Sequence, residues 1–209
     1  MKRIVIPIIV LLFTKLAYGQ KGNPSAVNNA PPTKKEAELD SKNRNCVKKV
    51  NNSFTTRLKN YPFNQAAQIQ LVSFKGGIDT SEFQDMKMND CLPMLNDTVC
   101  YSKLMEVRTI TYQQVDKLTD ILYNYGFGGP VYIGSSSMCY FPRNAILFLD
   151  ANGKVYEFIE ICFECRETRT SSERISLGQM CNQKMQMLKN FFKDAQIEYG
   201  ITKGLRTDN

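Results

Sequence analysis

The sequence of 209 residues contains neither histidine nor tryptophan. Without histidine there is no Ser/His/Asp or Cys/His nucleophile system, no histidine-ligated zinc site, and no side chain that ordinarily titrates near neutral pH. The chemistries that remain are carboxylate pairs, cysteine redox reactions, and acid–base roles for lysine or tyrosine. These absences favour a binding or structural protein over a common hydrolase, and the sequence predicts no cofactor.

Long apolar runs are scarce as well, and the run at the N-terminus is short. Residues 4–13 are apolar, follow two basic residues, and precede the small residues Ala17 and Gly19. This order is typical of a cleavable signal peptide, here residues 1–19, and the run is too short to span a bilayer comfortably. A retained anchor is the alternative. We therefore expect a secreted or periplasmic chain that starts near Gln20 and has no membrane span after cleavage.

The charge balance is only mildly basic once this segment is removed. Lys2, Arg3 and Lys15 leave with it, so the 27 basic side chains of the whole sequence fall to 24, against 20 acidic ones. The basic residues are scattered along the chain, whereas nucleic-acid binding requires a stripe that neutralises phosphates. The sequence therefore predicts no nucleic-acid partner and leaves an unknown protein or a small ligand.

The remaining chain divides into a spacer and one domain. Residues 20–42 are rich in Pro, Asn and Ser and poor in large apolar side chains, which predicts a flexible spacer. Residues 43–209 predict a single α+β domain with an antiparallel sheet. We expect one helix near the N-terminal end of this domain, from Cys46 to Leu58, and a second in its central part. A third helix is expected near the C-terminus, beginning at Ser176.

Local signals place the central elements of this domain. Residues 66–74 and 105–110 have the β-branched character of strands, and Thr111 with Gln114 forms a capping box for a helix that Gly126 should end. Asn152-Gly153 between two β-rich runs predicts a hairpin over about residues 144–162, with a turn of two or four residues.

Seven cysteines in an exported chain suggest up to three disulfides and one remaining thiol. The hairpin brings Cys139 opposite residues 164–166, so we expect a bridge from Cys139 to Cys162 or Cys165, with Cys181 taking the other. A further bridge, between Cys91 and Cys100, is expected to pin the loop of residues 75–100. The disulfide candidates are Cys91, Cys100, Cys139, Cys162, Cys165 and Cys181.

Two alternatives to structural disulfides involve the Cys162-Phe-Glu-Cys165 motif. The first is an exported thiol–disulfide oxidoreductase that uses Cys162 and Cys165 as its catalytic pair, although thioredoxin-like proteins place this motif at a helix N-terminus. The second is a zinc site. Its four thiolate ligands would be Cys139, Cys162, Cys165 and Cys181.

Charged side chains gather at the open end of the predicted hairpin. Carboxylates and guanidinium groups at one place can bind a charged ligand, or they can form an ion-pair network on a solvated surface. The residues concerned are Arg143, Glu160, Glu164, Arg166, Glu167 and Arg169. We take Arg143, Glu160, Glu164 and Arg166 as ligand-binding candidates. The leading hypothesis is a non-catalytic binding or structural module.

Overall fold

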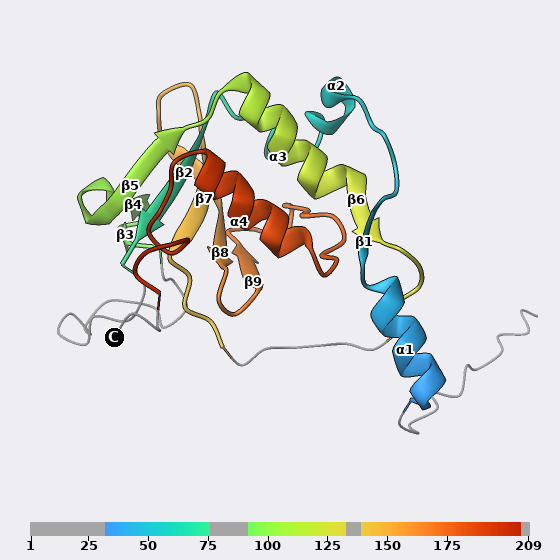
Figure 1. The fold of residues 1–209 in the computed structure, drawn as a ribbon. Helices are drawn as coiled ribbons and strands as arrows, with labels where there is room; N and C mark the ends of the chain where they lie inside the picture. Colours follow the sequence, from blue (N-terminus) through green and yellow to red (C-terminus); the bar gives the residue numbers. More distant parts are fainter. Residues whose placement is uncertain (1–31, 76–91, 133–138, 206–209) are drawn as a thin grey trace, which may run out of the picture. The chain divides into compact units, whose positions relative to one another are not determined.

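Five antiparallel strands form the central sheet of the folded unit, which begins at Thr33. The computed structural model describes residues 32–75, 92–132 and 139–205. The strand order is β5-β2-β7-β8-β9, and Figure 1 shows the strands beside the helices. Their bounds are β2 (Gln68–Phe74), β5 (Leu104–Thr109), β7 (Asn144–Leu149), β8 (Val155–Cys162) and β9 (Glu167–Thr170). The predicted α+β class with an antiparallel sheet is confirmed, and both strands predicted before residue 111 are present.

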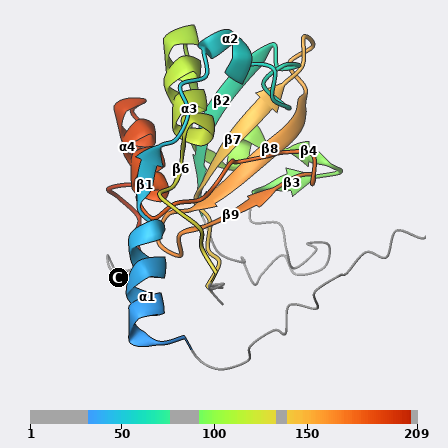
Figure 2. The ribbon, with the colours of Figure 1, turned by 90° about the vertical axis from the view of Figure 1, so that its right-hand side faces the viewer.

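The two faces of this sheet are covered by different elements. Helices α3 (Tyr112–Asn124) and α4 (Lys184–Asp194) lie on one side, and the hairpin of β3 (Met94–Leu95) and β4 (Thr98–Val99) lies on the other (Figure 2). On the helix side, Leu71 and Phe148 pack with Leu122 and Phe192. On the hairpin side, Leu147 joins a smaller apolar cluster with Leu92. Strand β7 is buried at every position because both faces are covered.

The predicted hairpin is formed by β7 and β8. The backbone N–H of Asp150 donates to the carbonyl of Lys154 at 2.9 Å, which leaves residues 151–153 as a three-residue loop. Gly153 takes the left-handed conformation at φ 77° that this loop needs. The Asp150 carboxylate accepts the backbone N–H groups of Asn152 and Lys154, each at 2.9 Å, and so favours a loop between the two expected lengths.

The expected N-terminal helix over residues 46–58 is wrong. Cys46–Lys48 forms strand β1, which pairs antiparallel with β6 (Tyr125–Phe127), and only Phe54–Arg57 is helical, as α2. The hydroxyl of Ser53 accepts the backbone N–H of Thr56 and starts that short helix. The Asn-Asn-Ser stretch before it favours a turn and a cap over helix interior, so the apolar spacing was misleading.

Two other helix boundaries differ from expectation. Helix α3 begins with the predicted Thr111 and Gln114 capping box, but Gly126 lies in β6 because the backbone is already extended at Tyr125. Helix α4 begins at Lys184, since the hydroxyl of Ser176 accepts the nearby Gly178 N–H in a local turn. Gly178 itself is left-handed at φ 64°, a conformation outside the right-handed helical region.

The chain before β1 contains a further helix. Helix α1 (Lys34–Asn43) opens with a capping box between Thr33 and Glu36, and all of it except Asn43 lies within the predicted spacer. The predicted signal peptide, residues 1–19, and residues 20–31 of the predicted spacer lie outside the described residues. A 3-10 turn, η2 (Tyr101–Lys103), precedes β5. No helix in the described ranges is long and apolar enough to cross a membrane.

Candidate functional site

Two disulfides join segments around the end of the sheet. Cys139 is bonded to Cys165, with their Cα atoms 5.5 Å apart, which is one of the two pairings that the hairpin predicted. The expected pairing of Cys181 with the other cysteine of the motif is wrong, because Cys181 is bonded to Cys46. The sequence places Cys46 at the start of a predicted helix. Its position in β1, next to the segment before α4, makes it the partner instead.

The remaining described cysteines carry free thiols. Cys162 is buried, with 1% of its surface exposed, and Cys100 is half-buried. Cys100 therefore does not form the disulfide that was expected to pin the loop of residues 75–100, and Cys91 lies outside the described residues. Cys162 and Cys165 are not bonded to each other, but the Cys165 N–H donates to the Cys162 Sγ at 3.2 Å.

The predicted four-thiolate zinc set is also contradicted. Cys139, Cys165 and Cys181 are consumed in disulfides, so only Cys162 of the set retains a thiol that could become a ligand. Across the described ranges, no three cysteine or carboxylate side chains converge as a metal-ligand group.

The structure gives the residues of the predicted charge cluster different partners. Arg143 and Glu164 form an ion pair at 2.9 Å, as their shared place at the hairpin's open end suggested. The guanidinium of Arg166 donates instead to the backbone carbonyl of Asn182 before α4. Glu160 lies on the sheet face that carries the β3–β4 hairpin, and its facing residue in β7 is Ala145, two positions from Arg143 on the same face. The described contacts therefore join Arg143 to Glu164 and turn Arg166 toward the segment before α4.

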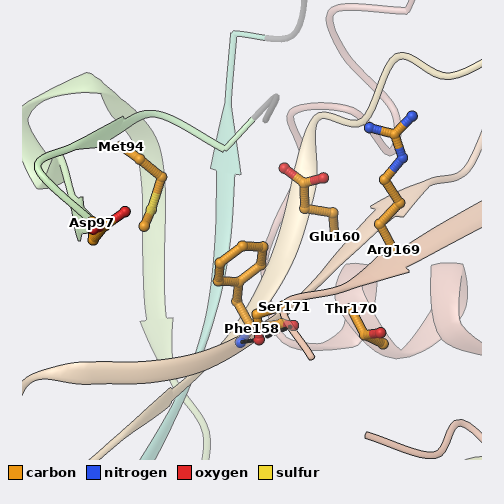
Figure 3. A pocket seen from close by; sticks show the side chains of 7 residues that line it. All are labelled: Met94, Asp97, Phe158, Glu160, Arg169, Thr170 and Ser171. Atoms are coloured by element: carbon orange, nitrogen blue, oxygen red, sulfur yellow. Dashed lines mark hydrogen bonds between the residues drawn. The ribbon is translucent and has the colours of Figure 1, made fainter. Parts of the chain in front are cut away.

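Glu160 instead lines a cavity of about 400 Å³, which we call the β8–β9 pocket. Figure 3 shows Glu160 and Arg169 side by side on neighbouring strands, with Met94 and Asp97 of the β3–β4 hairpin across from them. The pocket forms where this short hairpin leaves β8 and β9 uncovered. Its lining residues are Met94, Asp97, Phe158, Glu160, Arg169, Thr170 and Ser171.

The two charged side chains on the sheet are held in place by Tyr140. The Tyr140 hydroxyl donates to the Glu160 carboxylate at 3.0 Å, and the Arg169 guanidinium lies 3.9 Å from the centre of the Tyr140 ring. The Leu92 N–H also donates to Glu160, at 2.5 Å. Glu160 and Arg169 face each other directly in the β8–β9 register, and Glu160 is only 2% exposed. Opposite charges thus stand preorganised at one wall of the pocket.

No protein-family model, curated protein or solved structure matches this chain. The geometry of the site therefore carries the functional argument alone.

Behind the pocket, the Glu157 carboxylate is enclosed by hydroxyl groups on the helix side of β8. It accepts hydrogen bonds from Ser171, Tyr61 and Ser172, the last at 2.9 Å. Burial opposes the ionisation of Glu157, but these donors hold its pKa below the usual value. Burial, together with the Glu157 contact, raises the pKa of Tyr61. Because each of these hydroxyl groups donates to Glu157, we interpret the cluster as a structural support that fixes Ser171 at the pocket wall.

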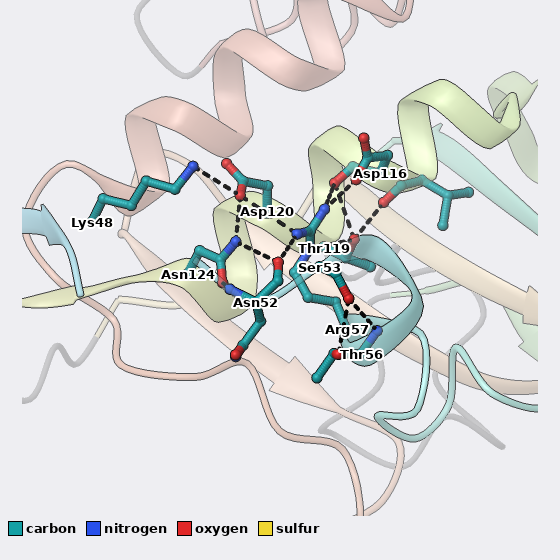
Figure 4. Close-up of polar contacts among 10 residues, drawn as sticks. Lys48, Asn52, Ser53, Thr56, Arg57, Asp116, Thr119, Asp120 and Asn124 are labelled. Carbon is teal, nitrogen blue, oxygen red and sulfur yellow. Dashed lines mark hydrogen bonds and ion pairs between the residues drawn. The ribbon is translucent and has the colours of Figure 1, made fainter. Parts of the chain in front are cut away.

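A second polar network, centred on the buried Arg57 and shown in Figure 4, joins α2 to α3. The Arg57 guanidinium is ion-paired with Asp116 and lies 3.8 Å from Asp120, while its Nε donates to the Thr119 hydroxyl at 3.2 Å. The Asp120 carboxylate also pairs with Lys48 of β1, at 3.4 Å. The network ties the N-terminal segment to α3 and leaves no donor directed at a ligand, so it is structural.

Sequence reasoning missed most of the pocket. Arg169 had been placed in the charge cluster, but Tyr140, Phe158 and Ser171 had no local signal of their own. The available signal was the alternation of β8, which puts Phe158 and Glu160 on one face. Using it required knowing where β9 pairs with β8.

Proposed function

We propose that this chain is an exported, disulfide-stabilised binding module that holds a small zwitterionic ligand in the β8–β9 pocket. The observation that carries the proposal is the preorganised pair of opposite charges on the pocket wall, Glu160 and Arg169, each in contact with Tyr140. Pockets that bind small molecules combine apolar walls with a few fixed polar groups. Two disulfides support export, because such bonds persist in oxidising compartments.

The chemistry of the lining favours an amino-acid-like ligand. Arg169 can bind a carboxylate through two parallel hydrogen bonds. The carboxylates of Glu160 and Asp97 favour an ammonium group on the ligand. The phenyl ring of Phe158 and the thioether of Met94 offer an apolar surface for the ligand's side chain. A cavity of about 400 Å³ suits a molecule of this size. We therefore propose a free amino acid or a dipeptide.

Matched ligands test this assignment. The exported chain is titrated calorimetrically with the common amino acids, each as the free acid, as the carboxamide, and as the N-acetyl derivative. At least one free acid should bind, and both derivatives of it should bind at least about tenfold more weakly. The expected loss reflects about 1.5 to 3 kcal/mol for a charge-assisted hydrogen bond.

Matched variants locate the binding. Arg169→Met should weaken binding of the free acid at least about tenfold and leave the carboxamide unchanged. Arg108→Met is the control, because Arg108 lies in β5, the strand at the other edge of the sheet from β9. This variant should bind both the free acid and the carboxamide as the unaltered chain does. The proposal is overturned if no free amino acid binds, or if Arg169→Met and Arg108→Met bind it equally well.

A further inference from the structure

Three cysteines are brought together at the turn between β8 and β9. Cys162 is the last residue of β8 and carries a buried free thiol. Cys165 lies three residues later within the turn, and it forms the disulfide with Cys139. The backbone N–H of Cys165 donates to the Cys162 Sγ at 3.2 Å. The free thiol is therefore held against the residue that carries a disulfide sulfur.

This arrangement supplies the parts of a thiol–disulfide exchange. Exchange requires a thiolate beside a disulfide sulfur, and it passes the bond from one thiol to another without any net oxidation. The Cys165 N–H points at the Cys162 sulfur and would stabilise negative charge as it develops there. In C-x-x-C motifs, a thiolate three residues from its partner is commonly the attacking group.

The two sides of the existing disulfide are anchored differently. The β8–β9 turn is held by Phe163 against Phe192, with ring centres 5.4 Å apart, and by the ion pair of Glu164 with Arg143. Neither contact depends on Cys139, which lies outside regular secondary structure. The turn can therefore keep Cys162 and Cys165 together while Cys139 leaves.

We propose that Cys162 is an internal nucleophile that converts the Cys139–Cys165 disulfide into a Cys162–Cys165 disulfide. The Cys162 thiol loses its proton to solvent, and its sulfur attacks the Cys165 Sγ. The bond between Cys165 and Cys139 breaks, and Cys139 leaves as a thiolate that takes up a proton. One disulfide and one thiol are present before and after the step, so no external oxidant is needed.

Release of Cys139 has a consequence for the pocket. Cys139 immediately precedes Tyr140, whose hydroxyl contacts Glu160 and whose ring lies under Arg169. Exchange removes the covalent tie next to Tyr140 and loosens the two charged side chains. This consequence rests on the proposed function, whereas the exchange itself does not. The chain would then hold its ligand more weakly in the exchanged form.

Trapping the released thiol tests the exchange without any ligand. The full exported chain is purified at pH 5, where exchange is slow, and moved to pH 8.5 with excess maleimide. Samples are acidified at intervals, digested without reduction, and mapped by mass spectrometry. We expect maleimide on Cys139 to increase together with peptides that carry a Cys162–Cys165 bond. Cys100, a half-buried free thiol, serves as the internal labelling control.

Variants of the attacking residue complete the test. Cys162→Ala and Cys162→Ser should keep the Cys139–Cys165 bond and show no labelling of Cys139. The proposal is overturned if maleimide modifies Cys162 while Cys139–Cys165 stays intact, or if neither cysteine is labelled after a day. Uncatalysed rearrangement takes minutes to hours, so a day is sufficient. Because the labelling uses no ligand, a failure of amino-acid binding would not contradict the proposed exchange. A failure of the exchange would likewise not contradict amino-acid binding.

Discussion

Lys184 shows how one buried charge can replace a helix cap. Its side chain is fully buried at the start of α4, and its amine donates to the carbonyls of Leu122 at 2.7 Å and Tyr125 at 2.9 Å. The last carbonyls of a helix lack partners within the helix. The amine satisfies one of them, that of Leu122, together with the carbonyl of Tyr125 directly after α3, where Gly126 is expected to end the helix through its conformation. It also brings the start of α4 against the end of α3.

Burial lowers the pKa of Lys184 to about 8, from 10.5 in the unfolded chain. Between these pH values the unfolded chain binds one proton more, so stability should rise with pH by about 1.4 kcal/mol per unit. Lys184→Met should remove this rise and also lower stability, since two carbonyls lose their donor. Urea unfolding at pH 7, 8, 9 and 9.5 measures both effects.

The control for this slope is Lys193→Met, which changes an exposed lysine on the same helix. It should keep the slope of the unaltered chain. Parallel stability curves for the unaltered chain and Lys184→Met would show that the ammonium is not destabilised by burial.

At the scale of elements, the N-terminal segment is held by covalent and polar contacts more than by apolar packing. Among the described strands, β1 pairs only with the short β6, and the Cys46–Cys181 disulfide connects it to the segment before α4. The Cys46 N–H also donates to the Gln183 side chain at 2.7 Å. Val47 in β1 is 42% exposed, so apolar burial contributes little there. We infer that this disulfide carries much of the attachment of β1.

Removing the two disulfides should therefore have unequal effects. The Cys46–Cys181 disulfide joins residues that are 135 positions apart in sequence, and the Cys139–Cys165 disulfide joins residues that are 26 positions apart. In the chain-entropy model these closures contribute about 5 and about 3.5 kcal/mol, because the larger loop loses more freedom in the unfolded state. We expect the Cys46→Ala/Cys181→Ala variant to be the less stable of the two double alanine variants.

Urea unfolding of both double variants at pH 7 checks this order. A greater loss in Cys139→Ala/Cys165→Ala would show that native contacts at the pocket, and not loop closure, set the effect of each bond.

At the scale of the whole molecule, composition bears on where the protein works. The N-terminal segment predicts cleavage before Gln20, and the disulfides are of the kind that oxidising compartments preserve. We expect the exported protein to start near Gln20, as measured by its intact mass. Replacing Leu11 and Leu12 by arginine should abolish export, because a charged segment no longer serves as the apolar region of a signal. An exported chain that retains residues 1–19 would contradict the prediction.

Local signals predicted the elements whose conformation depends on neighbours in sequence. The Thr111 and Gln114 capping box, the loop glycine at 153, and the strand over Gln68–Phe74 were all expected at or near their observed places. The same signals failed for residues 46–58, where helical spacing lost to an Asn-Asn-Ser turn and to pairing with a strand about 80 residues away. Long-range pairing of this kind leaves no periodic pattern in one segment.

The sequence by itself determined the chemistry that is available: no histidine catalysis, an antiparallel α+β fold around one hairpin, and Cys139 beside the end of β8. Tertiary structure decided which partners meet. It paired Cys181 with Cys46, left the Cys162 thiol buried, paired Arg143 with Glu164, and set Glu160 against Arg169 in a pocket. The physical reason is that alternation along a strand fixes the face of the sheet on which a side chain lies. The group that this side chain contacts depends instead on the register and packing of segments distant in sequence.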